Sequence, residues 1–151
     1  MGVDITQRNA DRNQSTADYQ RKNVFLFGNR YQEVTFLNNT GASLDIENGL
    51  LVKRNPADVT QVIPATKGAD GVELSKTIGI LSIEGKATLL DAGTISANVC
   101  ISGDVDSSLL AFPAATTLAT LATAVGKTYK DILTALGFVL FNVVEGSKFD
   151  N

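Results

Sequence analysis

The chain has 151 residues, 44% of them apolar, which suits a single domain with a substantial hydrophobic core. It contains one Cys and no His, and its net charge is −3. These values exclude Ser–His and Cys–His nucleophile pairs, an internal disulfide and a zinc site built from His and Cys, and they argue against a nucleic-acid partner.

A polar segment opens the chain. Residues 1–22 contain too few apolar side chains to offset an ordering cost of about 1–2 kcal/mol per residue. Residues 1–30 carry five basic and three acidic side chains, a net +2, whereas the remaining 121 residues carry a net −5. We therefore expect an N-terminal arm over residues 1–30 that is mobile in the free protein and binds an acidic surface; a solvated tail is the simpler alternative.

The sequence shows neither a membrane-spanning segment nor a secretory signal. No apolar run reaches the ~18–20 residues of a membrane span. Residues 1–22 also lack the apolar centre of a secretory signal. We expect a soluble protein with no membrane partner.

Residues 23–28 form a short apolar patch where the arm meets the body. The patch predicts a strand, or an anchor that holds a partner. Alternatively, Phe25 and Phe27 lie in the core or in a subunit interface.

The body, residues 31–145, begins with short predicted strands at 31–37, 43–46, 50–53 and 59–63. The second and third flank Asn48-Gly49, a dipeptide typical of hairpin turns, so we expect these two strands to pair. A polar tail, residues 146–151, follows the body.

The middle of the body contains the clearest strands. Residues 67–71 include two glycines and predict a flexible surface loop, and strands are expected at 78–83 and 94–102. The second of these alternates with a period of two. Its predicted inner side chains are Ile95, Ala97, Val99 and Ile101, and its predicted outer ones are Ser96, Asn98, Cys100 and Ser102.

Helical spacing occurs only near the C-terminus. One predicted helix contains Leu118, Leu121, Ala122 and Val125, and a second contains Tyr129, Ile132, Leu133 and Leu136, with Gly137 as its C-terminal cap. A closing strand is expected at residues 138–144. The sequence therefore predicts a mainly β (α+β) fold with one or two short C-terminal helices and an extended N-terminal arm.

Candidate catalytic residues are few. Asp104 and Asp106 could hold a hard cation or exchange protons, but the other ligands of a calcium loop are missing and a solvated turn is favoured. Gly126-Lys127-Thr128 lacks the earlier glycine of a phosphate loop and better fits a helix start. Cys100 has no base nearby in the sequence. We expect no enzyme activity, no metal site and no cofactor.

Four segments in the second half of the body follow one another in the same order as similar segments of a known protein family. They are residues 78–82, 95–101, 103–109 and 132–140, and the last contains Leu133 followed by Gly137-Phe138-Val139-Leu140. Together they resemble the head-decoration (capsid cement) protein D family of tailed bacteriophages, the phage lambda type, over roughly residues 43–140. The polar N-terminal segment, the loop at 67–75 and the tail after residue 144 depart from the family pattern.

The resemblance implies a β-clip-like domain with peripheral helices that assembles as a homotrimer. It further implies binding to the major capsid protein on the outer surface of the expanded virion shell, which the trimer stabilises, after synthesis in the cytoplasm of the bacterial host. The alternatives are another structural virion protein, such as a tail or fibre-base accessory, and a carboxylate-based small-ligand binder.

The capsid contact is expected in the arm. Its charged and aromatic side chains would meet the shell, and apolar side chains at residues 24–27 would anchor it. The predicted capsid-binding residues are Arg8, Arg12, Tyr19, Arg21, Lys22, Val24, Phe25 and Phe27.

Overall fold

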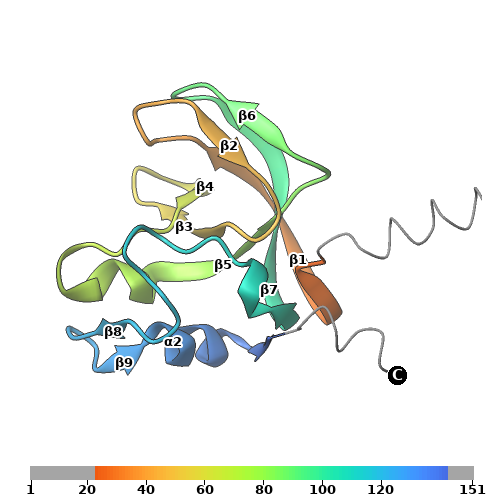
Figure 1. Cartoon of the computed structure of the whole chain (residues 1–151). Coiled ribbons are helices and arrows are strands. Elements are labelled where there is room, and N and C mark those ends of the chain that lie inside the picture. Colours follow the sequence, from red (N-terminus) through yellow and green to blue (C-terminus); the bar gives the residue numbers. More distant parts are fainter. Residues whose placement is uncertain (1–22, 143–151) are drawn as a thin grey trace, which may run out of the picture.

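A computed structural model describes residues 23–142 of the chain. The fold is mainly β with short helices, as the sequence predicts, and it is drawn in Figure 1. The elements in chain order are β1 (Phe25–Leu37), β2 (Leu44–Ile46), β3 (Leu51–Asn55), β4 (Asp58–Pro64), the 3-10 helix η1 (Ala69–Lys76), β5 (Thr77–Ser82), β6 (Ala87–Leu89), β7 (Thr94–Asp106), the 3-10 helix η2 (Ser107–Leu109), β8 (Leu121–Ala122), β9 (Lys127–Thr128), α2 (Tyr129–Leu136) and β10 (Phe138–Phe141).

Five strands close into a barrel in the order β1, β4, β3, β5 and β7, because β1 also pairs with β7. The pairing of β1 with β4 is parallel and short, and the other pairings in the ring are antiparallel. Each strand contributes a fully buried side chain to the interior. These side chains are Phe36, Val62, Val52, Leu81 and Val99.

The small sheet of β2 and β6 extends this interior cluster. Ile46 of β2 is fully buried within it, and Leu44 and Leu89 pack against it. This sheet lies at one end of the molecule, whereas α2, β8 and β9 lie at the other (Figure 1).

A second apolar cluster lies outside the barrel, where η1 and α2 cover β3, β5 and β7. It contains Leu51, Ile80 and Cys100 from the strands and Leu74 and Leu133 from the helices. Successive side chains of a strand point to opposite faces, so these strands are buried on both sides.

Burial along β7 differs from the predicted pattern at two residues. Ala97 and Val99 point inward as expected, but Cys100 is fully buried and Ile101 is 36% exposed. Cys100 lies on the outer face of β7 as predicted, but the second cluster buries that face at this point, and the prediction that Ile101 lies inside is wrong.

Gly79 lets β5 and β7 approach closely. A Cβ atom at this position would lie 2.3 Å from the carbonyl oxygen of Cys100 and 2.5 Å from Val99 Cγ1. A side chain would therefore force the two strands apart, so the glycine within the family-like segment 78–82 is explained by packing.

Helix α2 begins and ends as the sequence predicts. The hydroxyl of Thr128 accepts a hydrogen bond from the Asp131 N–H, and the Asp131 carboxylate accepts one from the Thr128 N–H, which is a complete capping box. Gly137 ends the helix with φ 107°, in the left-handed region, and β10 follows at once.

Three predicted elements are wrong. The segments on either side of Asn48-Gly49 do not pair with each other; β2 pairs with β6, and β3 pairs with β4 and β5. Asn48 instead accepts a hydrogen bond from the N–H of Ile83. The predicted loop at 67–71 runs into η1, where Gly71 is buried against Ala122.

The third wrong element is the helix predicted to contain Leu118 and Val125. That stretch forms turns and the two-stranded sheet of β8 and β9. Ala122 is fully buried, but Leu121 and Val125 are 53% and 41% exposed, so the helical spacing does not mark a buried face.

Candidate binding surface on a three-stranded ribbon

The C-terminal half of β7 extends beyond its pairing with β5 and becomes the centre of a ribbon formed by β1, β7 and β10. Asp104 pairs with Phe27 of β1 on one side and with Val139 of β10 on the other. β1 runs antiparallel to β7, whereas β10 runs parallel to it. The described chain begins just before β1 and ends just after β10, on the same side of the molecule (Figure 1).

One face of the ribbon packs on the second apolar cluster. Val105 and Phe138 are buried there, and Phe25 and Leu140 pack partly against them. The other face exposes Phe27, Val139 and Phe141 by 78%, 50% and 45%. We call these three residues the outer apolar face. Large apolar side chains gathered on one exposed face are typical of interaction surfaces.

Both long edges of the ribbon are open within the described part of the chain. β1 pairs with β4 only at Thr35 and Phe36, so no strand lies along that edge from Phe25 to Tyr31. β10 is the last strand of the sheet order. Open edges present unpaired backbone groups to which another strand can bind.

Three of the predicted capsid-binding residues lie in the part of the chain that the structure describes. Arg8, Arg12, Tyr19, Arg21 and Lys22 lie outside the described residues. Val24 is a core residue that is 5% exposed, and its carbonyl accepts a hydrogen bond from the Asp106 N–H at 2.8 Å.

Phe25 and Phe27 lie on opposite faces of the ribbon. Phe25 packs partly on the second cluster and makes an edge-to-face contact with Tyr31, with ring centroids 5.6 Å apart. Phe27 is exposed on the opposite face. Residues 25–30, which the sequence assigns to the arm, form the first half of β1, so the boundary at residue 30 falls inside a strand.

Asp104 and Asp106 belong to β7, so the prediction of a solvated turn is wrong. Asp106 is 2% exposed, and its Oδ1 accepts hydrogen bonds from the N–H and hydroxyl of Ser108 at 3.1 and 2.6 Å. It therefore caps η2. Residues 23–142 contain no group of three or more His, Cys, Asp or Glu side chains arranged to hold a metal ion.

Cys100 is held in the core by polar contacts. Its thiol donates to the carbonyl of Ser102 at 3.2 Å, and Asn29 Nδ2 lies 3.6 Å from its Sγ. Burial raises the pKa of the Cys100 thiol, so the nucleophilic thiolate is disfavoured.

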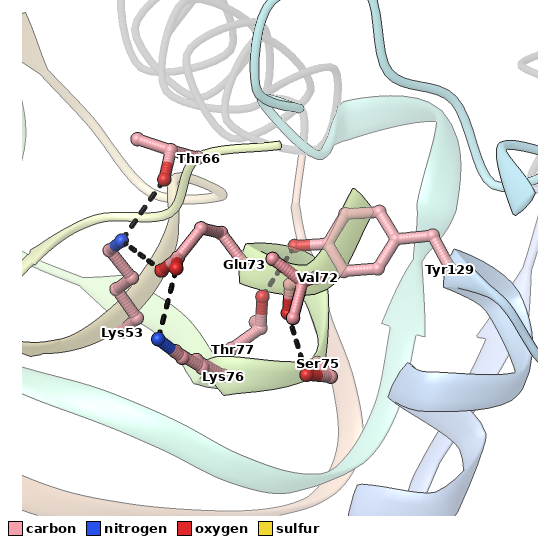
Figure 2. Close-up of polar contacts among 8 residues, drawn as sticks. All are labelled: Lys53, Thr66, Val72, Glu73, Ser75, Lys76, Thr77 and Tyr129. Carbon is pink, nitrogen blue, oxygen red and sulfur yellow. Dashed lines mark hydrogen bonds and ion pairs between the residues drawn. The ribbon is translucent and has the colours of Figure 1, made fainter. Parts of the chain in front are cut away.

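An ionic cluster connects β3 to η1 (Figure 2). Lys53 Nζ lies 2.8 Å from Glu73 Oε2 and 3.0 Å from Thr66 Oγ1, and Lys76 Nζ lies 2.9 Å from Glu73 Oε1. The hydrogen bond from Lys53, followed by that from Lys76, lowers the pKa of Glu73. Both lysines bind the same carboxylate, so the cluster fits a structural connection better than a reactive site.

The same view contains a buried hydroxyl pair (Figure 2): the oxygens of Thr77 and Tyr129 lie 2.9 Å apart. Burial raises the pKa of Tyr129 to about 12, which keeps the phenol neutral. Sequence reasoning missed the Thr77–Tyr129 pair and the Lys53–Glu73 ion pair, whose partners are 52 and 20 residues apart; only Glu73 and Lys76, three residues apart, have a spacing that could have indicated contact.

Comparisons with protein-family models, with curated proteins and with solved structures found no match. Between Asn23 and Asn142, no helix is long and apolar enough to cross a membrane.

Proposed function

We propose that the protein is a capsid decoration protein that binds the outer surface of an expanded phage head and stabilises the shell as a homotrimer. The major capsid protein would be its partner, and the virion surface its final location after synthesis in the bacterial cytoplasm. The observation that supports this most is the position of the outer apolar face. It lies near Asn23, where the described chain begins and to which the basic N-terminal segment is joined.

The physical role would be to resist lateral separation of shell subunits. Packaged DNA pushes the subunits apart, and a protein that bridges several of them adds contacts that separation must break. Three arms on one trimer bind multivalently, so a modest affinity of each arm gives a long-lived attachment.

Within the arm, the residues contribute in different ways. Arg8, Arg12, Arg21 and Lys22 would bind acidic groups of the shell, and Tyr19 would add an aromatic contact. Phe27 is the exposed apolar anchor, whereas Val24 would act only by fixing the start of β1 in the core.

The test is to incubate the purified protein with expanded heads that lack decoration and to image the bound copies. We expect density in sets of three at local three-fold positions. A variant without residues 1–22 should lose most of its occupancy while its near-ultraviolet circular dichroism stays unchanged. A second variant, with Gln at positions 8, 12, 21 and 22, keeps the length of the arm and tests its charge alone.

The possible outcomes separate the claims. Unchanged occupancy of the truncated variant would remove the arm from the proposal. Absence of binding by folded full-length protein would overturn the decoration function, and binding to tails instead of heads would favour the tail or fibre-base accessory.

A further inference from the structure

The Asn48-Gly49 dipeptide has a chemistry that the proposed function does not use. It is the only Asn-Gly pair in the sequence. The Gly49 nitrogen can attack Asn48 Cγ and expel ammonia, which closes a succinimide ring; water then opens the ring to aspartate or isoaspartate. Glycine favours this reaction because it has no side chain to hinder the nitrogen, and such reactions make asparagine a thermolabile residue.

Both reacting groups are hydrogen-bonded at the end of β5. Asn48 Oδ1 accepts a hydrogen bond from the Ile83 N–H at 2.6 Å, and the Gly49 N–H donates to the Leu81 carbonyl at 3.2 Å. Ring closure requires the nitrogen to lose its proton and the side-chain carbon to turn onto it. The two hydrogen bonds oppose these steps, because one holds the proton and the other holds the side-chain amide.

A second part of the chain also confines Gly49. The Gly49 carbonyl accepts a hydrogen bond from the Ala111 N–H at 2.9 Å. A Cβ atom at Gly49 would lie 2.5 Å from the Leu109 carbonyl oxygen and 3.5 Å from Val24 Cγ2. The dipeptide is therefore held at a junction between β5, residues 109–111 and Val24.

Water can reach this junction. Asn48, Leu109 and Leu110 line a surface hollow with a volume of about 670 Å³. The water that opens the succinimide can enter through this hollow, and the ammonia can leave by it. Deamidation is therefore restrained by hydrogen bonds and packing rather than by the exclusion of water.

We propose that Asn48 is a deamidation site whose reaction requires local opening of this junction, and that its isoaspartyl product loosens the base of the N-terminal segment. Isoaspartate carries the main chain through its side-chain carbon, so it adds a methylene group between residues 48 and 49. A Gly49 displaced in this way cannot keep its hydrogen bonds to both Leu81 and Ala111. The aspartate product keeps the ordinary backbone and an oxygen that can accept from the Ile83 N–H, so it should be tolerated.

The effect reaches the N-terminal segment through Val24. This residue is 5% exposed, its Cγ2 lies against Gly49, and its carbonyl accepts a hydrogen bond from the Asp106 N–H at 2.8 Å. Residues 1–22 join the described chain just before it, so a displaced Gly49 weakens the point at which the start of β1 is fixed in the core. The consequence for shell attachment rests on the proposed function, whereas the reaction and the loosening do not.

The first experiment measures the rate of deamidation. The full-length protein is held at mildly alkaline pH, either folded or in urea, and the peptide that contains Asn48 is followed by mass spectrometry and by enzymatic methylation of isoaspartate. We expect the folded protein to react at least about tenfold more slowly than the unfolded chain. Asn55 is an internal blank, because the nitrogen of Pro56 has no proton to lose. Equal rates in the two states would overturn the protection.

The second experiment separates local opening from global unfolding. Leu110→Ala and Leu74→Ala each truncate a buried leucine of the second cluster, but only Leu110 belongs to residues 109–111. The two variants are compared in urea concentrations that give them the same free energy of unfolding. Leu110→Ala should deamidate at least about threefold faster, and equal rates would overturn the local opening. Leu110→Val and Leu74→Val are the milder pair if an alanine variant fails to fold.

The third experiment tests the consequence for the fold. The isoaspartyl fraction of aged protein is compared with Asn48→Asp, which has the same added charge on an ordinary backbone. Hydrogen exchange of the Asp106 and Ala111 N–H groups, measured by NMR, should be at least about tenfold faster in the isoaspartyl fraction. Equal exchange would overturn the loosening. None of these measurements needs phage heads, so their failure leaves the decoration function intact, and a protein that deamidates as expected but never binds heads would contradict decoration alone.

Discussion

At the scale of single residues, the buried hydroxyls of Thr77 and Tyr129 satisfy each other. We expect Tyr129→Phe to lower the free energy of unfolding by about 1–2 kcal/mol, because it leaves the Thr77 hydroxyl buried without this partner. Urea denaturation measures the change. The double variant Tyr129→Phe/Thr77→Val removes both polar groups, so it should cost less than the sum of the two single variants; additive losses would contradict the pairing.

The same tyrosine predicts a loss of stability in alkali. The pKa of Tyr129 is about 12 in the folded protein, whereas an unfolded tyrosine ionises near pH 10. Between about pH 10 and 12 the unfolded state therefore binds fewer protons, and stability falls as the pH rises, by at most about 2.7 kcal/mol for this residue. Tyr129→Phe should show a shallower fall than the wild type in urea denaturation at a series of pH values.

Residue orientation is also where sequence reasoning reached its limit. The alternation along β7 correctly predicted inward-facing Ala97 and Val99, but a period of two cannot reveal that a second cluster buries Cys100 on the other face. Asn38, which follows β1, is fully buried, and its side-chain amide donates to the carbonyls of Ala42, Leu89 and Leu90. Such contacts depend on tertiary neighbours that lie up to 52 residues away.

At the scale of elements, the N-terminal cap of α2 can be tested by two equal substitutions. Thr128→Ala removes the capping hydroxyl and should cost about 1 kcal/mol. Thr134→Ala lies in the same helix, where an exposed Thr hydroxyl bonds back to the Lys130 carbonyl, so it should be neutral or slightly stabilising. Thermal unfolding compares the two, and equal losses would contradict the capping box.

The connection between β3 and η1 depends on Glu73 more than on Lys76. Glu73→Gln weakens the partner of Lys53, whose side chain is only 11% exposed, and should cost about 1–3 kcal/mol. Lys76→Ala breaks an exposed pair and should cost about 0–1 kcal/mol. The pKa of Glu73 is lowered in the folded state, so its contribution is present above its ordinary pKa and is lost as the pH falls through the folded value. Urea denaturation at neutral and acidic pH measures both effects.

Elements with strong local signals were predicted, and those defined by distant contacts were not. Helix α2 has a cap at each end, and β5 and β7 are clear apolar strands, so all three were confirmed. The stretch from Leu118 to Val125 has helical spacing and three Ala, but its buried Ala122 packs on Gly71 of η1, a tertiary contact that local propensity does not reveal. Asn48-Gly49 signals a turn but cannot specify which strands pair across it.

At the scale of the whole molecule, the two apolar clusters share β3, β5 and β7 and should unfold together. Ile46→Val in the barrel cluster and Ile80→Val in the second cluster should each cost about 0.5–1.5 kcal/mol. Both should shift one transition that circular dichroism and tyrosine fluorescence report identically in urea. Separate transitions for the two probes would show that the clusters are independent units.

The candidate surface was only partly predictable at this scale. The sequence indicated that residues 23–28 are apolar and adjoin a polar arm, and Phe27 is indeed exposed. It could not show that β10, more than a hundred residues later, lies on the other side of β7 and adds Val139 and Phe141 to the same face. That arrangement follows from the pairing of β7 with both strands.

The closure of the barrel by β1 and β7 also affects how the protein is made. β1 leaves the ribosome early, but its main partner is synthesised roughly 70 residues later, a delay of seconds at about 5–20 residues per second. During that delay only β4 can pair with β1, at Thr35 and Phe36, and the rest of β1 has no strand to cover it. Native structure must therefore form late in translation, and the nascent chain depends on low local concentration or on chaperones until β7 emerges.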